Sequence, residues 1–155
     1  MKKVLGWLLA IMTGITACEG PMWPMGPPGP SGDGYETQWF IRDYDILSHQ
    51  WELVFDQNMG SLFQFEIPVP EITKFVFDEG AVLCYLVQEI SSGGRTSLVQ
   101  SPLPYTFYGE IDGFFYSENY TFEVRTGYIN FIVKYSDFDT EIKPLSCTFH
   151  VVLIW

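Results

Sequence analysis

Apolar and polar residues alternate with a period of two from residue 35 to the C-terminus. Residues 120–125 read Tyr-Thr-Phe-Glu-Val-Arg, and the odd-numbered residues of 129–135 are all apolar or aromatic. Such alternation is typical of half-buried strands, and no stretch shows the 3.6-residue period of an amphipathic helix. The sequence therefore predicts an all-β domain.

Turn signals recur every 8–12 residues and divide this region into about nine or ten short strands. The clearest are Asn58–Ser61, Ser91–Arg95 and Thr126–Gly127. The pattern predicts an antiparallel β-sandwich, with a flattened barrel as the alternative. The sandwich is favoured because several strands are short and interrupted by proline.

Individual segments carry more specific expectations. Glu71–Phe77 reads as a short strand with its phenylalanines on one face, and Gly109–Gly113 reads as a turn. Ala81–Ile90 is apolar on both faces in its first half, which predicts a central strand covered on both sides. The last strand, from Cys147 to Trp155, is expected inside a sheet; at an edge it would be a candidate for strand exchange with a neighbour.

The N-terminus has the features of a secretion signal that ends in a lipidation site. Lys2 and Lys3 precede an apolar run over Val4–Ile15, which is shorter than the roughly 20 residues needed to span a bilayer. Ile15-Thr16-Ala17-Cys18 resembles the bacterial lipobox. The resemblance implies cleavage before Cys18 and acylation of its thiol and new amine. Several acyl chains anchor a protein stably, whereas one chain does so marginally.

A segment rich in proline and glycine follows over residues 18–34. Gly20, Gly26, Gly29 and Gly32 keep a collagen-like period of three, but Trp23 stands where another glycine would be needed. A semi-rigid spacer is therefore favoured over a collagen trimer, and about fifteen residues at ~3.1 Å each would reach about 45 Å. The predicted organisation is a signal peptide over 1–17, this linker over 18–34 and a β-domain over 35–155.

These features together resemble a group of small Bacteroidetes-type lipoproteins with a collagen-like Gly-Pro leader. Besides the lipobox and leader, the matching segments are 69–73 (Val-Pro-Glu-Ile-Thr), 80–86 (Gly-Ala-Val-Leu-Cys-Tyr-Leu) and 102–106 (Pro-Leu-Pro-Tyr-Thr). The resemblance implies a small β-domain held in the cell envelope, with the outer membrane as the expected site. It implies no activity and no functional residues.

The charge of the chain argues against two kinds of partner, nucleic acid and the surface of anionic lipid. There are 8 basic and 19 acidic residues. Removing the signal takes away two lysines, so the mature chain carries 6 basic and 19 acidic residues and a net charge of 6 − 19 = −13. Nucleic-acid binding and electrostatic adhesion to anionic lipid both need a basic face.

The search for catalytic motifs favours a protein that is not an enzyme and uses no cofactor. Nucleophile-elbow, zinc-protease, phosphate-loop and Cys-x-x-Cys motifs are all missing from the sequence. His49 and His150 stand alone in sequence, and adjacent strand residues such as Ser48 and His49 point to opposite faces. His150 is interpreted as a surface or interface imidazole.

Carboxylates and cysteines give weaker candidates for sites. Asp137, Asp139 and Glu141 alternate as oxygen ligands of Ca²⁺ can, although the EF-hand spacing is missing and a solvated loop is favoured. Cys84 and Cys147 could form a disulfide in an exported protein. Two unpaired buried thiols are the favoured interpretation.

Aromatic residues that fall out of phase with the predicted core faces are the candidate ligand-binding residues: Tyr108, Phe115, Tyr128 and Phe138. Exposed aromatic rings can stack on sugars or anchor protein interfaces; the alternative is that a second sheet buries them.

The predicted function is a non-enzymatic binding role for a glycan or envelope protein, in a protein held to the membrane by its lipid. The alternative is a structural subunit that oligomerises by strand exchange or through the leader. The membrane face and the oligomeric state are left open.

Overall fold

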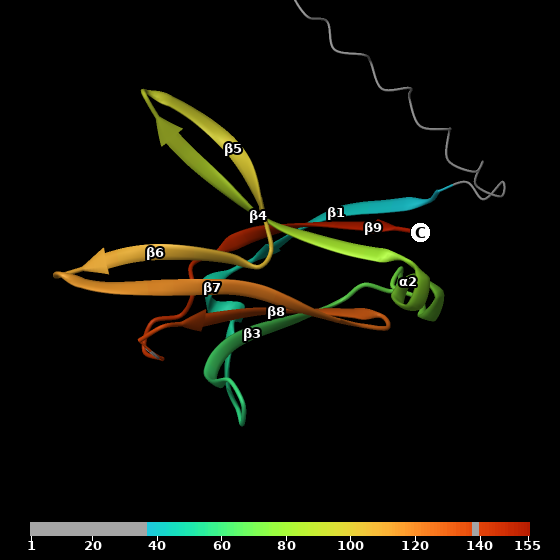
Figure 1. The fold of residues 1–155 in the computed structure, drawn as a ribbon, viewed down its shortest axis with the longest axis horizontal. Helices are drawn as coiled ribbons and strands as arrows, with labels where there is room; N and C mark the ends of the chain where they lie inside the picture. The colour runs from blue at the N-terminus through green and yellow to red at the C-terminus, as the bar shows by residue number, and fades with distance from the viewer. Residues whose placement is uncertain (1–36, 138–139) are drawn as a thin grey trace, which may run out of the picture. The chain divides into compact units, whose positions relative to one another are not determined.

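The computed structural model describes residues 37–137 and 140–155, which form a sandwich of two antiparallel sheets (Figure 1). The predicted signal peptide, the linker, Cys18 and Phe138 with Asp139 lie outside the described residues. The four-stranded sheet has the order β1-β9-β4-β5 and the five-stranded sheet the order β2-β3-β8-β7-β6. The all-β sandwich predicted from the alternation is thus confirmed, with nine strands.

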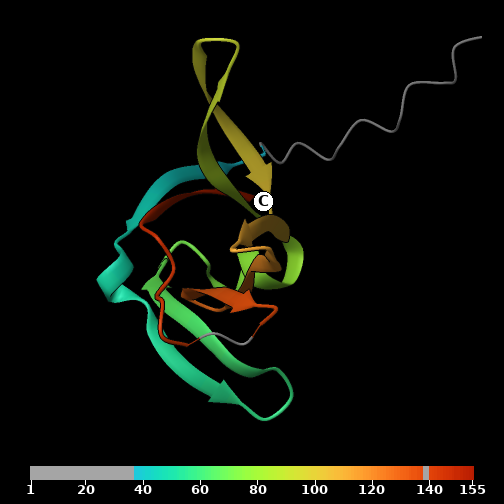
Figure 2. The same ribbon diagram turned by 90° about the vertical axis from the view of Figure 1, so that its left-hand side faces the viewer.

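The elements in chain order are β1 Trp39–Ile46, η1 Ser48–Gln50, β2 Glu52–Asp56, β3 Gly60–Pro68, α2 Lys74–Glu79, β4 Ala81–Ser92, β5 Arg95–Pro102, β6 Tyr105–Ile111, β7 Phe114–Arg125, β8 Tyr128–Tyr135 and β9 Cys147–Ile154. The chain crosses from one sheet to the other four times: between β1 and β2, between β3 and β4, between β5 and β6, and between β8 and β9. Figure 2 shows the two layers from one end of the sandwich. In the described residues, no helix is long and apolar enough to cross a membrane.

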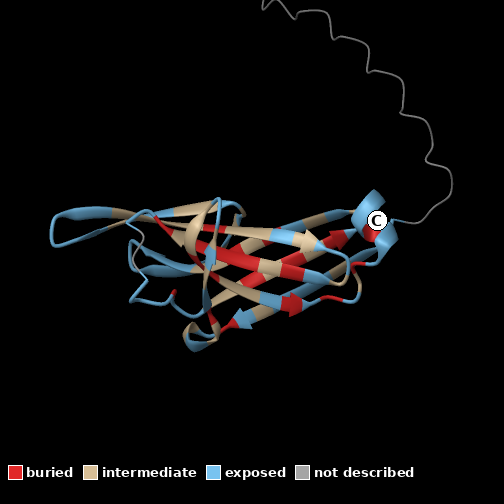
Figure 3. Ribbon diagram, turned by 90° about the horizontal axis from the view of Figure 1, so that it is seen from below, coloured by how far each residue is buried: buried red, intermediate tan, exposed pale blue. Residues whose placement is uncertain are grey.

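The core lies between β8 and β9, the central strands of the two sheets. Phe131 on β8 stacks on Phe149 of β9, with ring centroids 4.0 Å apart and planes 12° apart. Trp51, which is fully buried, meets the other side of Phe149 edge-on at 6.4 Å. The buried residues gather along these central strands (Figure 3), so the alternation predicted for both strands is confirmed.

Strand β9 lies between β1 and β4, so the expected interior position of the last strand is confirmed. Strand exchange was predicted only for a last strand at the edge of a sheet, and β9 does not lie at an edge. Strand β4 is central as predicted, but it is not covered on both sides: Leu83 on its outer face is exposed. The same holds at β2, where Leu53 and Phe55 are exposed because this edge strand is not covered by the opposite sheet.

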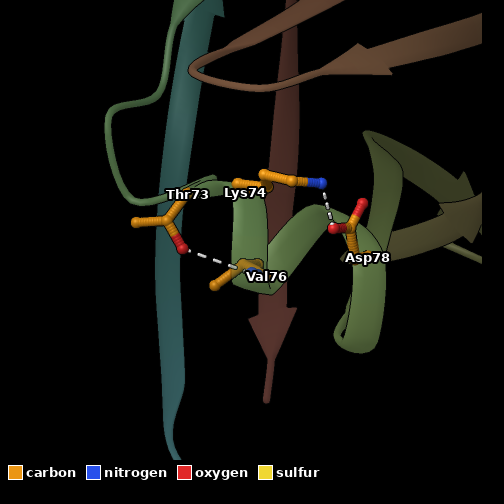
Figure 4. Close-up of polar contacts among 4 residues, drawn as sticks. All are labelled: Thr73, Lys74, Val76 and Asp78. Atoms are coloured by element: carbon orange, nitrogen blue, oxygen red, sulfur yellow. Dashed lines mark hydrogen bonds and ion pairs between the residues drawn. The ribbon is translucent and has the colours of Figure 1, made fainter.

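The strand predicted over Glu71–Phe77 is wrong, because residues Lys74–Glu79 form a short helix. Thr73 caps it: the Thr73 hydroxyl accepts a hydrogen bond from the Val76 amide at 3.2 Å, and Lys74 pairs with Asp78 one turn later (Figure 4). A capping side chain satisfies an amide that the helix leaves free. Val76 is the buried residue, while the two phenylalanines that suggested a strand face are exposed.

Gly80 follows the last residue of the helix; its amide donates to the Val76 carbonyl at 3.0 Å, and no side chain fits at this position. A Cβ at this position would lie 2.6 Å from the Val76 carbonyl oxygen and 2.9 Å from that of Ile154. Both are backbone atoms and cannot rotate away. The glycine therefore sets how closely α2 approaches the end of β9.

Replacing Phe149 with alanine should lower the free energy of unfolding by about 3–5 kcal/mol, because it leaves a cavity between Phe131 and Trp51. Phe115→Ala is the matched control: this ring is exposed, so the change should stay within about 0.5 kcal/mol. Chemical denaturation followed by tryptophan fluorescence measures both. Equal losses in the two variants would contradict the assignment of the Phe131–Phe149 pair as the centre of the core.

Candidate functional site

The β6–β7 hairpin extends beyond the sheet to which it belongs. Strand β8 pairs with β7 only from Glu118 onward, whereas β6 continues to pair with β7 as far as Phe114. Residues 108–117, here named the hairpin tip, are therefore a two-stranded ribbon that projects from the sandwich (Figure 1). Most of this ribbon is exposed, as Figure 3 shows, because no further strand or layer of the described residues covers it.

Asp112 and Gly113 form the turn of this hairpin. Both have positive φ values, 52° and 82°. A two-residue turn with positive φ at both positions matches the twist of the flanking strands, and Asp-Gly is a preferred pair for it. The turn predicted over Gly109–Gly113 is therefore too long: Gly109–Ile111 belong to β6 and pair with β7.

Three aromatic side chains at the tip are largely exposed: Tyr108 at 78%, Phe114 at 79% and Phe115 at 82%. The register puts Tyr108 and Phe115 on the outer face of the hairpin, with Glu110 and Ser117, and Phe114 on the inner face with Ile111. Both faces of the ribbon are therefore apolar and accessible. Surface exposure of one large apolar residue is ordinary, but a cluster of this kind marks an interaction site.

Gly109 allows Tyr116 to lie across the ribbon. The two residues face each other in the register, and a Cβ on Gly109 would come within 2.5 Å of the Tyr116 ring. The ring thus packs directly against the backbone of β6. A side chain at position 109 would push the Tyr116 ring away from its place on the inner face.

An open groove lies between the inner face of the hairpin tip and the loop after β8. Its outer hollow has a volume of about 480 Å³, and its inner hollow has a volume of about 80 Å³. Both hollows are lined by Ile111, Tyr116, Asp137 and Ile142. Asp112, Phe114 and Phe115 also line the outer hollow, and Glu118 and Tyr135 line the inner hollow. The groove combines aromatic and aliphatic walls with carboxylates.

The Glu118 carboxylate has a fixed position at the inner end of the groove. It accepts a hydrogen bond from the Tyr120 hydroxyl at 2.6 Å. Burial is the main cause that raises the pKa of Tyr120 above its usual range, and the neighbouring Glu118 carboxylate adds to it. Tyr120 therefore stays a neutral hydroxyl that donates to Glu118.

The four aromatic residues predicted as a site do not form one surface. Tyr108 and Phe115 lie together, but Tyr128 pairs with Arg125 at the far end of β7, ten residues from Phe115. At ~3.3 Å per residue the separation is about 33 Å. The Arg125 guanidinium also lies 4.8 Å from the centre of the Tyr128 ring and shields one of its faces. Phe138 is outside the described residues.

Sequence reasoning missed Ile111, Phe114 and Ile142 as surface residues of the groove. The signal for the first two was present in the Asp-Gly pair at 112–113, which is a strong hairpin marker. Placing the turn there would have extended both strands and put Phe114 at the tip. Ile142 carries no such signal, because the fold of the loop brings it to the hairpin.

Among residues 37–137 and 140–155, no group of three or more His, Cys, Asp and Glu side chains is placed to hold a metal ion. Of the predicted Ca²⁺ ligands, Asp139 is not described, Asp137 lines the groove, and Glu141 is exposed. Asp43 and Asp45 share a face of β1. There they meet side chains of β9: Asp43 contacts His150, and Asp45 accepts from the Thr148 hydroxyl at 2.6 Å.

His150 and Asp43 make the His–carboxylate pair that hydrolytic chemistry would require. The pair lies on the outer face of the four-stranded sheet, and the ring of Tyr85 is 6.1 Å from His150. It is remote from the groove, since neither residue lines it. His49 lies in η1, and its backbone carbonyl accepts from Lys143 at 3.2 Å.

Cys84 and Cys147 are unpaired thiols. Cys84 faces Val151 in the register, four residues from Cys147 along β9, which corresponds to about 13 Å. A disulfide needs Cα atoms within about 7 Å. Burial raises the pKa of both thiols to about 12, so these cysteines pack as apolar residues.

The two thiols should resist a thiol-reactive dye at pH 8 while the domain is folded, because both stay protonated and covered. In a Cys18→Ala background the dye should label the folded chain by less than 0.1 equivalent, and by two equivalents in 6 M guanidinium. Mass spectrometry counts the labels. Rapid labelling of the folded chain, or no labelling after unfolding without a reductant, would contradict the thiol assignment.

No family model, no curated protein and no solved structure matches this chain. The similarity to small Bacteroidetes-type lipoproteins therefore stays a prediction from the residues alone.

Proposed function

We propose that this chain is a lipid-anchored protein of the bacterial envelope that binds a protein partner through the β6–β7 hairpin tip. The observation that carries the proposal is the exposure of Tyr108, Phe114 and Phe115 on one projecting ribbon. Large aromatic residues dominate the energetics of protein interfaces when they become buried. The domain does not need them for its own core, which lies between β8 and β9.

The position of the hairpin within the sandwich supports the proposal. The first described strand begins at Trp39, beside the end of β9, and the hairpin tip lies at the opposite end of the sandwich (Figure 1). A lipid on Cys18 and the linker over 18–34 would hold the domain by the end near Trp39. The hairpin tip is therefore at the end of the sandwich remote from the start of β1, where a partner can reach it.

A protein partner suits the tip better than a single sugar chain does. Apolar side chains lie on both faces of the ribbon, and among the described residues β6 pairs only with β7. A partner could therefore contact both faces and the free edge of β6 together. Each of these contacts would bury apolar surface or satisfy backbone groups.

A glycan is the second candidate, and the outer face alone supports it. Tyr108 and Phe115 lie there beside Glu110 and Ser117, which offer acceptors and a donor for hydroxyl groups. Phe114, on the inner face, would not take part. The two candidates therefore differ in the effect that a Phe114 substitution should have.

A photo-reactive phenylalanine at position 115 should cross-link to one discrete protein in living cells. The same residue at position 98 is the control, because Leu98 is also exposed, at 75%, but lies on β5. In the variant that carries the photo-reactive residue at position 115, Phe114→Ser should reduce the yield of the adduct at least tenfold without lowering the free energy of unfolding. Equal adducts from positions 98 and 115 would contradict docking at the hairpin tip. The glycan would be favoured if position 115 gave no protein adduct and the chain bound to a glycan array equally well with and without Phe114→Ser.

The anchor has its own test. Cys18→Ala should leave the chain unprocessed before residue 18 and without the mass of the acyl chains, because the thiol that receives the lipid is gone. Fractionation and mass spectrometry of the membrane and soluble fractions measure this. Wild-type processing and membrane retention in the Cys18→Ala variant would show that the anchor is assigned wrongly.

A further inference from the structure

The charges around the hairpin tip are all of one sign. Residues 105–119, which include the whole tip, contain Glu110, Asp112 and Glu118 but no lysine or arginine. Asp137 adds a further carboxylate to the lining of the groove. An apolar surface surrounded by carboxylates would repel an acidic partner and favour a basic one.

The cations near the groove are directed elsewhere. Lys134 precedes Tyr135 on β8, so its side chain lies on the opposite face of that strand, where the register pairs it with Asn119 and its charge acts on Asp56. Lys143 lies in the same loop as Ile142, but its ammonium group donates to the carbonyl oxygens of His49 and Trp51, at 3.2 and 2.7 Å. Arg125, on the same strand as Glu118, pairs with Glu66 at the far end of β7. None of these three cations lines the groove.

The groove has the chemistry that a long basic side chain requires. Ile111 and Ile142 can contact the aliphatic stem of a lysine or arginine, while its charged end needs an anion. Glu118 supplies that anion at the inner end, and Tyr116 and Tyr135 line the same hollow. Aromatic faces attract cations, and a carboxylate between apolar walls interacts more strongly than one in open water.

We infer that the partner docks as a polypeptide segment in which apolar residues flank a lysine or arginine, whose side chain enters the groove towards Glu118. This inference rests on the proposed binding at the hairpin tip and adds the chemistry of the partner. Charge complementarity decides between occupants: a second copy of this chain would bring the same acidic rim against itself, and a neutral glycan would offer no positive charge to the Glu118 carboxylate. The apolar residues of the segment cover Phe114 and the neighbouring aromatic rings.

The test is a titration of the purified full-length Cys18→Ala chain with a dye-labelled ten-residue peptide that alternates Lys with Leu. A twin peptide carries Gln in place of every Lys. Fluorescence anisotropy at about 0.15 M salt keeps long-range attraction to the acidic chain screened. The basic peptide should bind at least tenfold more tightly than its neutral twin.

Charge-removing variants show whether the groove is the site. Glu118→Gln keeps an acceptor for Tyr120, and Asp112→Asn keeps a residue that tolerates positive φ, so both should fold normally. Each should weaken binding of the basic peptide at least fivefold. Glu89→Gln, which removes an exposed carboxylate from β4, should change it less than twofold.

The outcomes separate this inference from the proposed function. Equal binding of the two peptides, absence of binding, or equal losses in Glu89→Gln and Glu118→Gln would each overturn the basic-segment inference. In cells, an adduct from position 115 that persists unchanged in Glu118→Gln would also overturn it, yet would leave docking at the hairpin tip standing. Absence of any adduct from position 115 would remove both proposals.

Discussion

The stacking of Phe131 on Phe149 is the contact on which the two sheets depend. These rings come from the central strands of opposite sheets, with centroids 4.0 Å apart, and Trp51 closes the pair from the side. The buried residues of β8 and β9 continue this contact along the sandwich. The buried core residues come mostly from the inner strands of the two sheets, and the edge strands β2, β5 and β6 contribute none of them, so these edge strands are covered less completely.

The hairpin tip is a consequence of that arrangement. β7 extends beyond the last residue that pairs with β8, and the opposite sheet does not cover this extension. Aromatic side chains on a ribbon without a covering layer keep most of their surface accessible. The aromatic side chains of Phe131 and Tyr135 on β8 are buried in the core. Those of the hairpin tip are available for binding because β7 extends beyond β8, and not because their chemistry differs.

The sequence predicted only part of the site, because the turn of the β6–β7 hairpin was placed wrongly. Tyr108 and Phe115 were identified because they are out of phase with the core, and both are exposed. Phe114 was missed because the turn was placed over Gly109–Gly113, although Asp112-Gly113 is the pair with positive φ at both positions. The strand predicted over Glu71–Phe77 is also wrong. Two alternating phenylalanines suggested a strand face, but the Thr73 hydroxyl caps a helix of six residues there.

The sequence by itself determined the strand pattern, the interior position of the last strand and the acidic character of the domain. These follow from side-chain periodicity and composition, which are local properties of the chain. Only the tertiary structure decided which out-of-phase aromatic residues lie together, because Phe115 lies near the start of β7 whereas Tyr128 lies beside Arg125 at its other end. It also decided that Ile142 and Glu118 share a groove, since that contact depends on how a loop folds back on a hairpin.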